Sequence, residues 1–273
     1  MTSPPRKLNL DEWDARYEQL VRAGLREPGY GGPLRRHLAL EGDLRLRHLR
    51  FDNSAAALRL WNFLLTENQR LHAARAQGEK IVGAMKDLGT VPVMAYSMPG
   101  LRAFYPDGAW WTPCLMECSD GLLQQAEQLG IDGSFCPVRA MLPAFQNSEH
   151  FPRPDALICS IGAVCDDLSA IAQRLERMGF PIVWWEMPRR RAPDAGEAAC
   201  ALPGNLRAPQ IQVDCVRAEL ERVGQALSVL AGQPLDDDTL ARGIRKANQV
   251  RRLLAALRQA VYTSPRAPLP ALE

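Results

Sequence analysis

The feature that most constrains the fold is an alternation of short apolar runs with helical patterns in the middle of the chain. The apolar run 155–159 is followed by a helical pattern that starts near Asp167, ends at Gly179, and leads into a second apolar run, 182–185. The apolar positions of that helical pattern are Leu168, Ile171, Leu175 and Met178. Their spacing of three and four is typical of a helix with one buried face. Strand, helix and strand in this order predict a right-handed crossover between parallel strands.

Two further patterns extend this unit toward the N-terminus. The run 91–96, Val-Pro-Val-Met-Ala-Tyr, predicts a buried strand, and the segment 119–130 has the polar start, apolar face and glycine stop of a helix. We therefore expect an α/β fold in which a parallel sheet contains strands 91–96, 155–159 and 182–185, with helices packed on it.

Both ends of the chain show helical patterns instead. In the first 78 residues the apolar spacing of three or four occurs twice, at Leu10, Trp13, Tyr17 and Leu20 and again at Leu58, Trp61, Leu65 and Asn68. A long helix starts near Val213 and should stop at Gly232. A second one follows Asp236 and should bury Leu240, Ile244, Ala247, Leu254, Leu257 and Val261. These two helices predict a helical hairpin.

The same patterns predict how the chain is divided. Residues 1–78 form an N-terminal helical segment, 79–200 an α/β domain that carries cysteines, and 201–273 the helical hairpin with a proline-rich stretch after Tyr262. That stretch resembles an interdomain connector.

Composition excludes several classes of partner. The formal net charge is only +2, which argues against nucleic acid or an anionic membrane as a partner. The basic run 189–191 lies between two prolines, which favours a solvated loop and leaves a phosphate contact as the alternative. No stretch approaches the roughly 18 apolar residues of a spanning helix, and the N-terminus lacks the apolar core of a secretory signal, so we expect a cytoplasmic protein. In that reducing compartment the seven cysteines should be thiols, metal ligands or redox groups.

Common catalytic signatures are absent from the sequence. It contains neither the glycine-rich nucleotide loops nor the Gly-x-Ser-x-Gly and His-Glu-x-x-His motifs. The four histidines are scattered, at positions 37, 48, 72 and 150, which argues against a multi-histidine metal site. Attention therefore falls on the cysteines.

Two cysteines stand in turns that suit a ligand site. Cys165 lies between the predicted strand 155–159 and the helix that Asp166 and Asp167 open, where a helix N-terminus favours the thiolate. Cys136 is followed by Pro137, which removes one backbone donor and holds its turn open. On spacing alone, the pattern favours a small buried hydrophobe for each.

The other cysteines have weaker patterns. Cys114 and Cys118 share one helix face and would hold a metal only with ligands from elsewhere. We expect Cys159 to point into the sheet, Cys200 to lie in a loop and Cys215 on a helix, none with a special role.

These residues belong to blocks that resemble one known family. The blocks are 78–93, 129–142, 151–167, 179–188 and 230–252, and in this order they resemble the 2-hydroxyacyl-CoA dehydratase and benzoyl-CoA reductase family. The first cysteine loop of that family is similar to the segment around Cys136, and the second is similar to the segment ending at Cys165. The run 103–111 is most similar to benzoyl-CoA reductase B-type subunits.

The resemblance implies a Rossmann-like or flavodoxin-like fold and an iron–sulfur subunit of an anaerobic acyl-CoA reductase or dehydratase, as in anaerobic aromatic degradation. It implies a [4Fe-4S] cluster with Cys136 and Cys165 as ligands, because family members hold the cluster with three cysteines in each of two homologous subunits. It also implies an acyl-CoA substrate and two protein partners, a homologous second subunit and an ATP-hydrolysing iron–sulfur activator that drives one-electron reduction of the thioester.

The chain departs from the family pattern at its C-terminus. The family's second α/β domain, which supplies the third cluster cysteine, has no counterpart before Glu273. We expect that the chain is truncated, or that Cys114, Cys118 or a partner subunit supplies the missing ligand. The alternative function is a truncated, non-catalytic homologue that acts as an assembly partner or cluster scaffold, and a generic α/β small-molecule binder is a third interpretation.

Overall fold

The computed structural model describes residues 66–85, 89–107, 120–148, 150–161 and 165–265. Before Thr66 it also describes residues 7–8, 11–12, 15, 18–19, 22, 51–52 and 63. The chain forms two compact units, and both are built from separate stretches. The first comprises Met1–Ala73, Asp107–Pro152 and Ala247–Glu273, and the second comprises Ala74–Pro106 and Arg153–Lys246. The predicted boundaries at 78 and 200 divide the chain along its sequence and stay a prediction.

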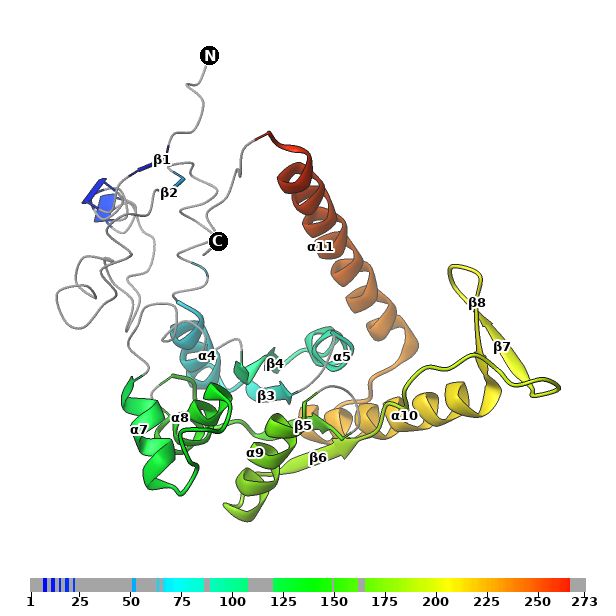
Figure 1. Ribbon diagram of the computed structural model, residues 1–273, viewed down its shortest axis with the longest axis horizontal. Helices are drawn as coiled ribbons and strands as arrows, with labels where there is room; N and C mark the ends of the chain where they lie inside the picture. The colour runs from blue at the N-terminus through cyan, green and yellow to red at the C-terminus, as the bar shows by residue number, and fades with distance from the viewer. Residues whose placement is uncertain are drawn as a thin grey trace. The chain divides into compact units, whose positions relative to one another are not determined.

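The second unit is built on a four-stranded parallel sheet, drawn from cyan to light green in Figure 1. Its strands are β3 (Lys80–Met85), β4 (Leu101–Phe104), β5 (Ala156–Ser160) and β6 (Ile182–Trp185), in the spatial order β4-β3-β5-β6. All neighbours pair in parallel. The predicted α/β class with a parallel sheet is therefore confirmed, and β5 and β6 are the two strands predicted at 155–159 and 182–185.

The third predicted strand is wrong, because residues 91–96 lie in a helix, α5 (Val91–Ser97). Pro92 stands in the first turn of α5, where its missing N–H leaves no hydrogen bond unmade, whereas in a central strand it would interrupt the ladder. Val91, Met94, Ala95 and Met98 are buried, which is the spacing of a helix that covers a sheet. The strands of this part of the sheet are instead β3 and β4, which come directly before and after this helix in the chain.

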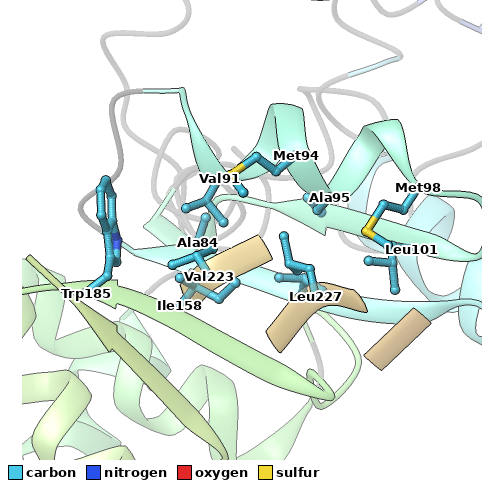
Figure 2. Packing of buried hydrophobic residues seen from close by; sticks show 12 residues of the cluster. Ala84, Val91, Met94, Ala95, Met98, Leu101, Ile158, Trp185, Val223 and Leu227 are labelled. Atoms are coloured by element: carbon cyan, nitrogen blue, oxygen red, sulfur yellow. The ribbon is translucent and has the colours of Figure 1, made fainter. Parts of the chain in front are cut away.

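Helices cover both faces of the sheet. On one face, α5 and α10 (Gln210–Ala231) form the main apolar cluster with the sheet (Figure 2). The strand residues of this cluster are Val82, Ala84, Leu101, Ala103, Ile158 and Trp185, and α10 contributes Val223 and Leu227. On the other face lies the predicted helix α9 (Asp166–Arg177), which buries Ile171 and Leu175 and whose Glu176 accepts a hydrogen bond from Trp184 Nε1 at 2.9 Å. Consecutive strand residues point to opposite faces of a sheet. Trp184 therefore faces α9, and Trp185 faces the cluster formed with α5 and α10.

The two predicted C-terminal helices are present, but the second one does not bury its apolar face. α10 ends at Gly232, whose φ of 68° is the left-handed conformation expected of a glycine stop. α11 (Asp237–Thr263) begins with Leu240 packed against the main cluster. Farther along, Leu254 and Leu257 are 53% and 43% exposed, so the predicted burial of this stripe is wrong in the part of α11 that the structure describes.

A short antiparallel pair, β7 (Ala199–Leu202) and β8 (Leu206–Pro209), comes directly before α10. The sequence patterns did not predict this pair. Cys200, predicted to lie in a loop, is therefore on the strand β7. The two ends of this strand, Ala199 and Leu202, pair with Pro209 and Leu206 of β8.

In the first unit, the predicted helix at 119–130 is confirmed as α7 (Asp120–Gln128). A 3-10 turn, η2 (Pro137–Ala140), leads into α8 (Met141–Asn147), and the rings of Phe145 and Phe151 pack edge to face with centroids 4.7 Å apart. β1 (Lys7–Leu8) pairs with β2 (Phe51–Asp52). α4 (Glu67–Ala76) begins in this unit, where it includes the buried Asn68, and its residues from Ala74 on belong to the second unit.

The apolar positions on which the N-terminal helix predictions rest lie outside the described residues. These are Leu10, Trp13, Tyr17, Leu20, Leu58, Trp61 and Leu65. The described residues between 11 and 22 are helical, as that pattern predicts. Within the described part of the chain, every helix is too short or too polar to cross a membrane.

Candidate functional site at the carboxyl edge of the sheet

The strand order creates a point at which the connections of the sheet change direction. From β3 the chain continues to β4 on one side, whereas β5 pairs on the other side of β3 and is followed outward by β6. The segments that leave the carboxyl ends of β3 and β5 therefore diverge. In open parallel sheets ligands gather at such a point.

Cys165 lies in the connection that leaves β5 at this point. It is the N-cap residue of α9, in an extended conformation with φ −147° and ψ 117°, and Asp166 and Asp167 occupy the first helical turn. The predicted strand-to-helix turn is thus confirmed. The thiol is half-buried, so Cys165 does not behave as a buried core residue.

Cys136 also precedes a helical turn, in the first unit. It caps η2, and its carbonyl oxygen accepts a hydrogen bond from the Arg139 N–H at 2.9 Å. Its side chain is exposed, which excludes the interpretation as a small buried hydrophobe. Because Cys136 belongs to the first unit and Cys165 to the second, their role as ligands of one cluster stays a prediction.

A buried arginine supports the turn that carries Cys136. Arg139 is 7% exposed, and its Nη1 donates to the carbonyl oxygen of Phe135 at 2.8 Å. Its contact with Glu127 is longer, 3.5 Å, and the Glu127 side chain is 52% exposed. The guanidinium therefore holds the backbone immediately before Cys136 more firmly than it pairs with a carboxylate.

The turn before Cys136 has a second local anchor. The carboxylate of Asp132 accepts the Ser134 N–H at 2.8 Å, and the pKa of Asp132 is lowered, mainly by its hydrogen bonds with Ser134. Asp132 thus remains ionised and caps the turn at neutral pH.

The remaining cysteines do not add to this site. Cys159 is buried on β5, as predicted, and Cys215 is exposed on α10. Cys114 and Cys118 lie outside the described residues. Among the residues that the structure describes, no three His, Cys, Asp or Glu side chains are grouped so that they could hold a metal ion.

One residue of the basic run 189–191, Arg191, stabilises the local structure. Arg191 forms a bidentate ion pair with Glu197, with donor to acceptor distances of 2.5 and 2.6 Å. The hydrogen bond from Arg191, together with the Asp194 N–H, lowers the pKa of Glu197 to about 2. Arg191 thus stabilises its own loop, and a phosphate contact in this run stays a prediction.

Sequence patterns missed two residues at the same edge as Cys165. Ser160 and Trp185 are the last residues of β5 and β6 and are register partners across the sheet. In the sequence, Trp185 simply ends the apolar run 182–185, and Ser160 lies one residue beyond the predicted strand 155–159. The available signal was a hydroxyl and an indole N–H at the carboxyl ends of two buried parallel strands, where a ligand would lie.

Comparison with known proteins adds one match. The family model described as 2-hydroxyglutaryl-CoA dehydratase, D-component, matches residues 81–273. This range contains the whole sheet except Lys80, together with Cys136, Cys165, α10 and α11. No curated protein matches the chain.

Proposed function

Because the chain belongs to the 2-hydroxyglutaryl-CoA dehydratase D-component family, we propose that it is the iron–sulfur subunit of an acyl-CoA dehydratase or reductase. The observation that carries this proposal is the position of Cys165. It caps α9 directly beyond β5, where the sheet's connections diverge. That is the place where a parallel sheet presents ligand groups.

The donor chemistry of the chain suits a [4Fe-4S] cluster. Such clusters are held by cysteine thiolates, and Cys136 and Cys165 both stand in turns with accessible side chains. Cys159, in contrast, is buried on its strand and has no comparable access. We therefore assign Cys136 and Cys165 as two of the thiolate ligands and look to a partner subunit, Cys114 or Cys118 for the third.

In such a subunit the cluster and the protein chain would contribute differently to the reaction. When bound, the cluster would supply low-potential electrons or a Lewis-acidic iron to a CoA thioester. The chain would hold Cys165 at the N-terminus of α9 and would fix the Cys136 turn through Arg139. The apolar layer formed by α5 and α10 would keep water from the adjacent face of the sheet.

The partners in this proposal follow from the family description, which names one component of a dehydratase. They are a homologous second subunit and an ATP-hydrolysing iron–sulfur activator. Within the family, we propose a benzoyl-CoA reductase-like subunit with a one-electron reduction of the thioester, on the basis of the run 103–111.

Anaerobic reconstitution with iron and sulfide tests the proposal. We expect the wild-type chain to bind iron and to develop the broad charge-transfer absorption of an iron–sulfur cluster, and Cys136→Ser and Cys165→Ser each to lose most of both. Cys215→Ser is the matched control, because Cys215 is a free thiol, exposed like Cys136, but lies on α10, and it should retain wild-type iron.

The result can contradict the proposal in two ways. Iron contents of the Cys136 and Cys165 variants equal to that of wild type would refute their assignment as ligands. A wild-type chain that binds no iron either alone or with its second subunit would refute the iron–sulfur function itself.

A further inference from the structure

Two buried polar side chains come from neighbouring strands at the carboxyl edge of the sheet and are not used by the proposed cluster ligation. Ser160 on β5 and Trp185 on β6 are register partners, so their backbones are about 4.8 Å apart. Partners in a parallel pair point to the same face. Ser160 follows Ile158 by two residues, which places its hydroxyl on the face where Ile158 and Trp185 join the main cluster (Figure 2).

Both side chains are buried, and both carry a polar atom that nothing in the described chain satisfies. Ser160 is 0% exposed and Trp185 is 1% exposed. Ser160 Oγ and Trp185 Nε1 make no hydrogen bond with any described residue. The backbone pairing continues one residue beyond β5, since the Ile161 N–H donates to the Trp185 carbonyl at 2.9 Å. The strand ladder therefore stays intact while two side-chain donors are left without acceptors.

An unsatisfied buried donor carries the whole cost of its desolvation. Nearly all buried polar groups in folded proteins have a partner, so two orphans side by side require one. An acceptor oxygen bound at the ends of these two strands would supply the missing partner. The site is close to the surface, because the next residue, Ile161, is 51% exposed.

The surroundings of the pair decide the chemical class of the acceptor. The buried cluster around Trp185 consists of apolar residues, with Val183 and Met187 partly buried against it. The charged pair nearby, Arg222 and Glu219, bonds the Trp184 carbonyl and the Glu186 N–H, and its two charges balance each other. A carboxylate or phosphate placed among these apolar side chains would be buried without a free counter-charge, because Arg222 is already paired with Glu219, and this has a large cost. A neutral carbonyl oxygen satisfies two neutral donors without that cost.

We propose that Ser160 and Trp185 form a binding site for a neutral carbonyl oxygen of the pantetheine-thioester arm of an acyl-CoA. This inference rests on the proposed function for the identity of the ligand, and on the two orphaned donors for the site. The acceptor is either the thioester carbonyl or one of the pantetheine amides, which share the same chemistry. Ser160 and Trp185 would orient the arm at the edge of the sheet that also carries Cys165.

Binding of acetyl-CoA and of CoA to the metal-free, full-length chain tests the site by isothermal titration calorimetry. We expect Ser160→Ala and Trp185→Phe each to weaken binding roughly three- to tenfold, since each removes one neutral hydrogen bond. A loss confined to acetyl-CoA identifies the thioester carbonyl, and an equal loss for both ligands identifies an amide. Trp184→Phe is the matched control, because Trp184 lies next in sequence, faces α9 and donates to Glu176.

A second measurement separates a ligand site from a merely structural role. Ser160→Ala removes a hydroxyl that has no partner, so the free chain should unfold at an equal or higher urea concentration even though it binds more weakly. Wild-type chain that binds neither ligand, or variants that bind both as well as wild type, would overturn the inference. Neither measurement requires iron, so the cluster proposal fails or holds separately, in the reconstitution of the cysteine variants.

Discussion

The carboxylate of Asp155 accepts the backbone N–H of Ile81 at 2.7 Å, while the Asp155 N–H donates to the Ile81 carbonyl at 2.8 Å. The same carboxylate oxygen lies 2.7 Å from Arg75 Nη1. Asp155 thus joins the central strands β3 and β5 at their amino ends and connects them to α4. The sheet is held by a charged group at one edge and leaves donors unsatisfied at the other.

Replacement of Asp155 should weaken the sheet in a pH-dependent way. Burial raises the pKa of Asp155, but hydrogen bonds from Arg75 and Ile81 and the charges of Arg75 and Lys80 together outweigh it, so the pKa is lowered. A lowered folded-state pKa stabilises the fold above the unfolded value, and this contribution is lost as the pH falls below about 4. We expect Asp155→Asn to cost about 1–3 kcal/mol at pH 7 by urea unfolding, and the difference from wild type to shrink toward pH 3.

Glu221→Gln is the control for that experiment, since Glu221 is 66% exposed and 3.9 Å from Arg217. It should change the free energy of unfolding by less than about 0.5 kcal/mol. An Asp155 variant whose destabilisation is the same at pH 7 and pH 3 would contradict the electrostatic account.

Gly83 on β3 should not tolerate a methyl group. A Cβ at this position would lie 2.6 Å from Leu157 Cδ2 and 3.2 Å from Pro106 Cγ, and Leu157 is fully buried. We expect Gly83→Ala to destabilise the chain by about 1–3 kcal/mol, measured by urea unfolding. Gly121→Ala on α7 is the matched control, because nothing lies within 4 Å of its Cβ position, and helix propensity should make it neutral or stabilising by up to about 1 kcal/mol.

Gly243 fixes where α11 crosses α5. A Cβ there would lie 1.7 Å from Ser97 Oγ and 3.3 Å from Ser97 Cα, so the clash involves backbone as well as side chain. A glycine-to-alanine change inside a helix normally stabilises by about 1 kcal/mol, whereas Gly243→Ala should destabilise by about 1–3 kcal/mol. Adding Ser97→Gly should recover part of the loss, and a stabilising Gly243→Ala would show that the two helices do not make this contact.

Arg139 should stabilise the Cys136 turn mainly through a carbonyl. Its short bond goes to the Phe135 oxygen, while its ion pair with the exposed Glu127 is long. We expect Arg139→Leu to cost about 1–3 kcal/mol and to accelerate amide hydrogen exchange around Cys136, because the Phe135 carbonyl loses its partner. Glu127→Gln should cost less than about 0.5 kcal/mol. Equal effects of the two substitutions would place the stabilisation in the ion pair instead.

The sequence predicted an element correctly where its apolar periodicity was combined with a signal for the start or end of that element. The strand at 182–185, the helix that Asp166 opens and the glycine stop at Gly232 all combine periodicity with an end signal, and all three are found. The position of Cys165 at a strand-to-helix turn followed from the same signals. These features are set by neighbouring residues and need no tertiary information.

The patterns failed where tertiary packing decides. The apolar run 91–96 would suit a buried strand or a buried helix equally well. Its packing on a face of the sheet, with Pro92 in a first helical turn, selects the helix. The stripe of α11 has helical periodicity, but periodicity does not show whether a neighbour covers it. Likewise, the orphaned donors of Ser160 and Trp185 are visible only once the register of β5 and β6 is known.

The arrangement of the central strands also bears on how the sheet forms. β3 is joined to β4, and β5 to β6, by single crossovers, but β3 and β5 pair across the chain from Met85 to Ala156, which contains β4 and the stretch Asp107–Pro152 of the other unit. Because the entropy of loop closure grows only with the logarithm of loop length, this insertion costs the native sheet little stability. Non-local pairing slows folding, however, so the insertion bears chiefly on the rate at which the two strand pairs become one sheet.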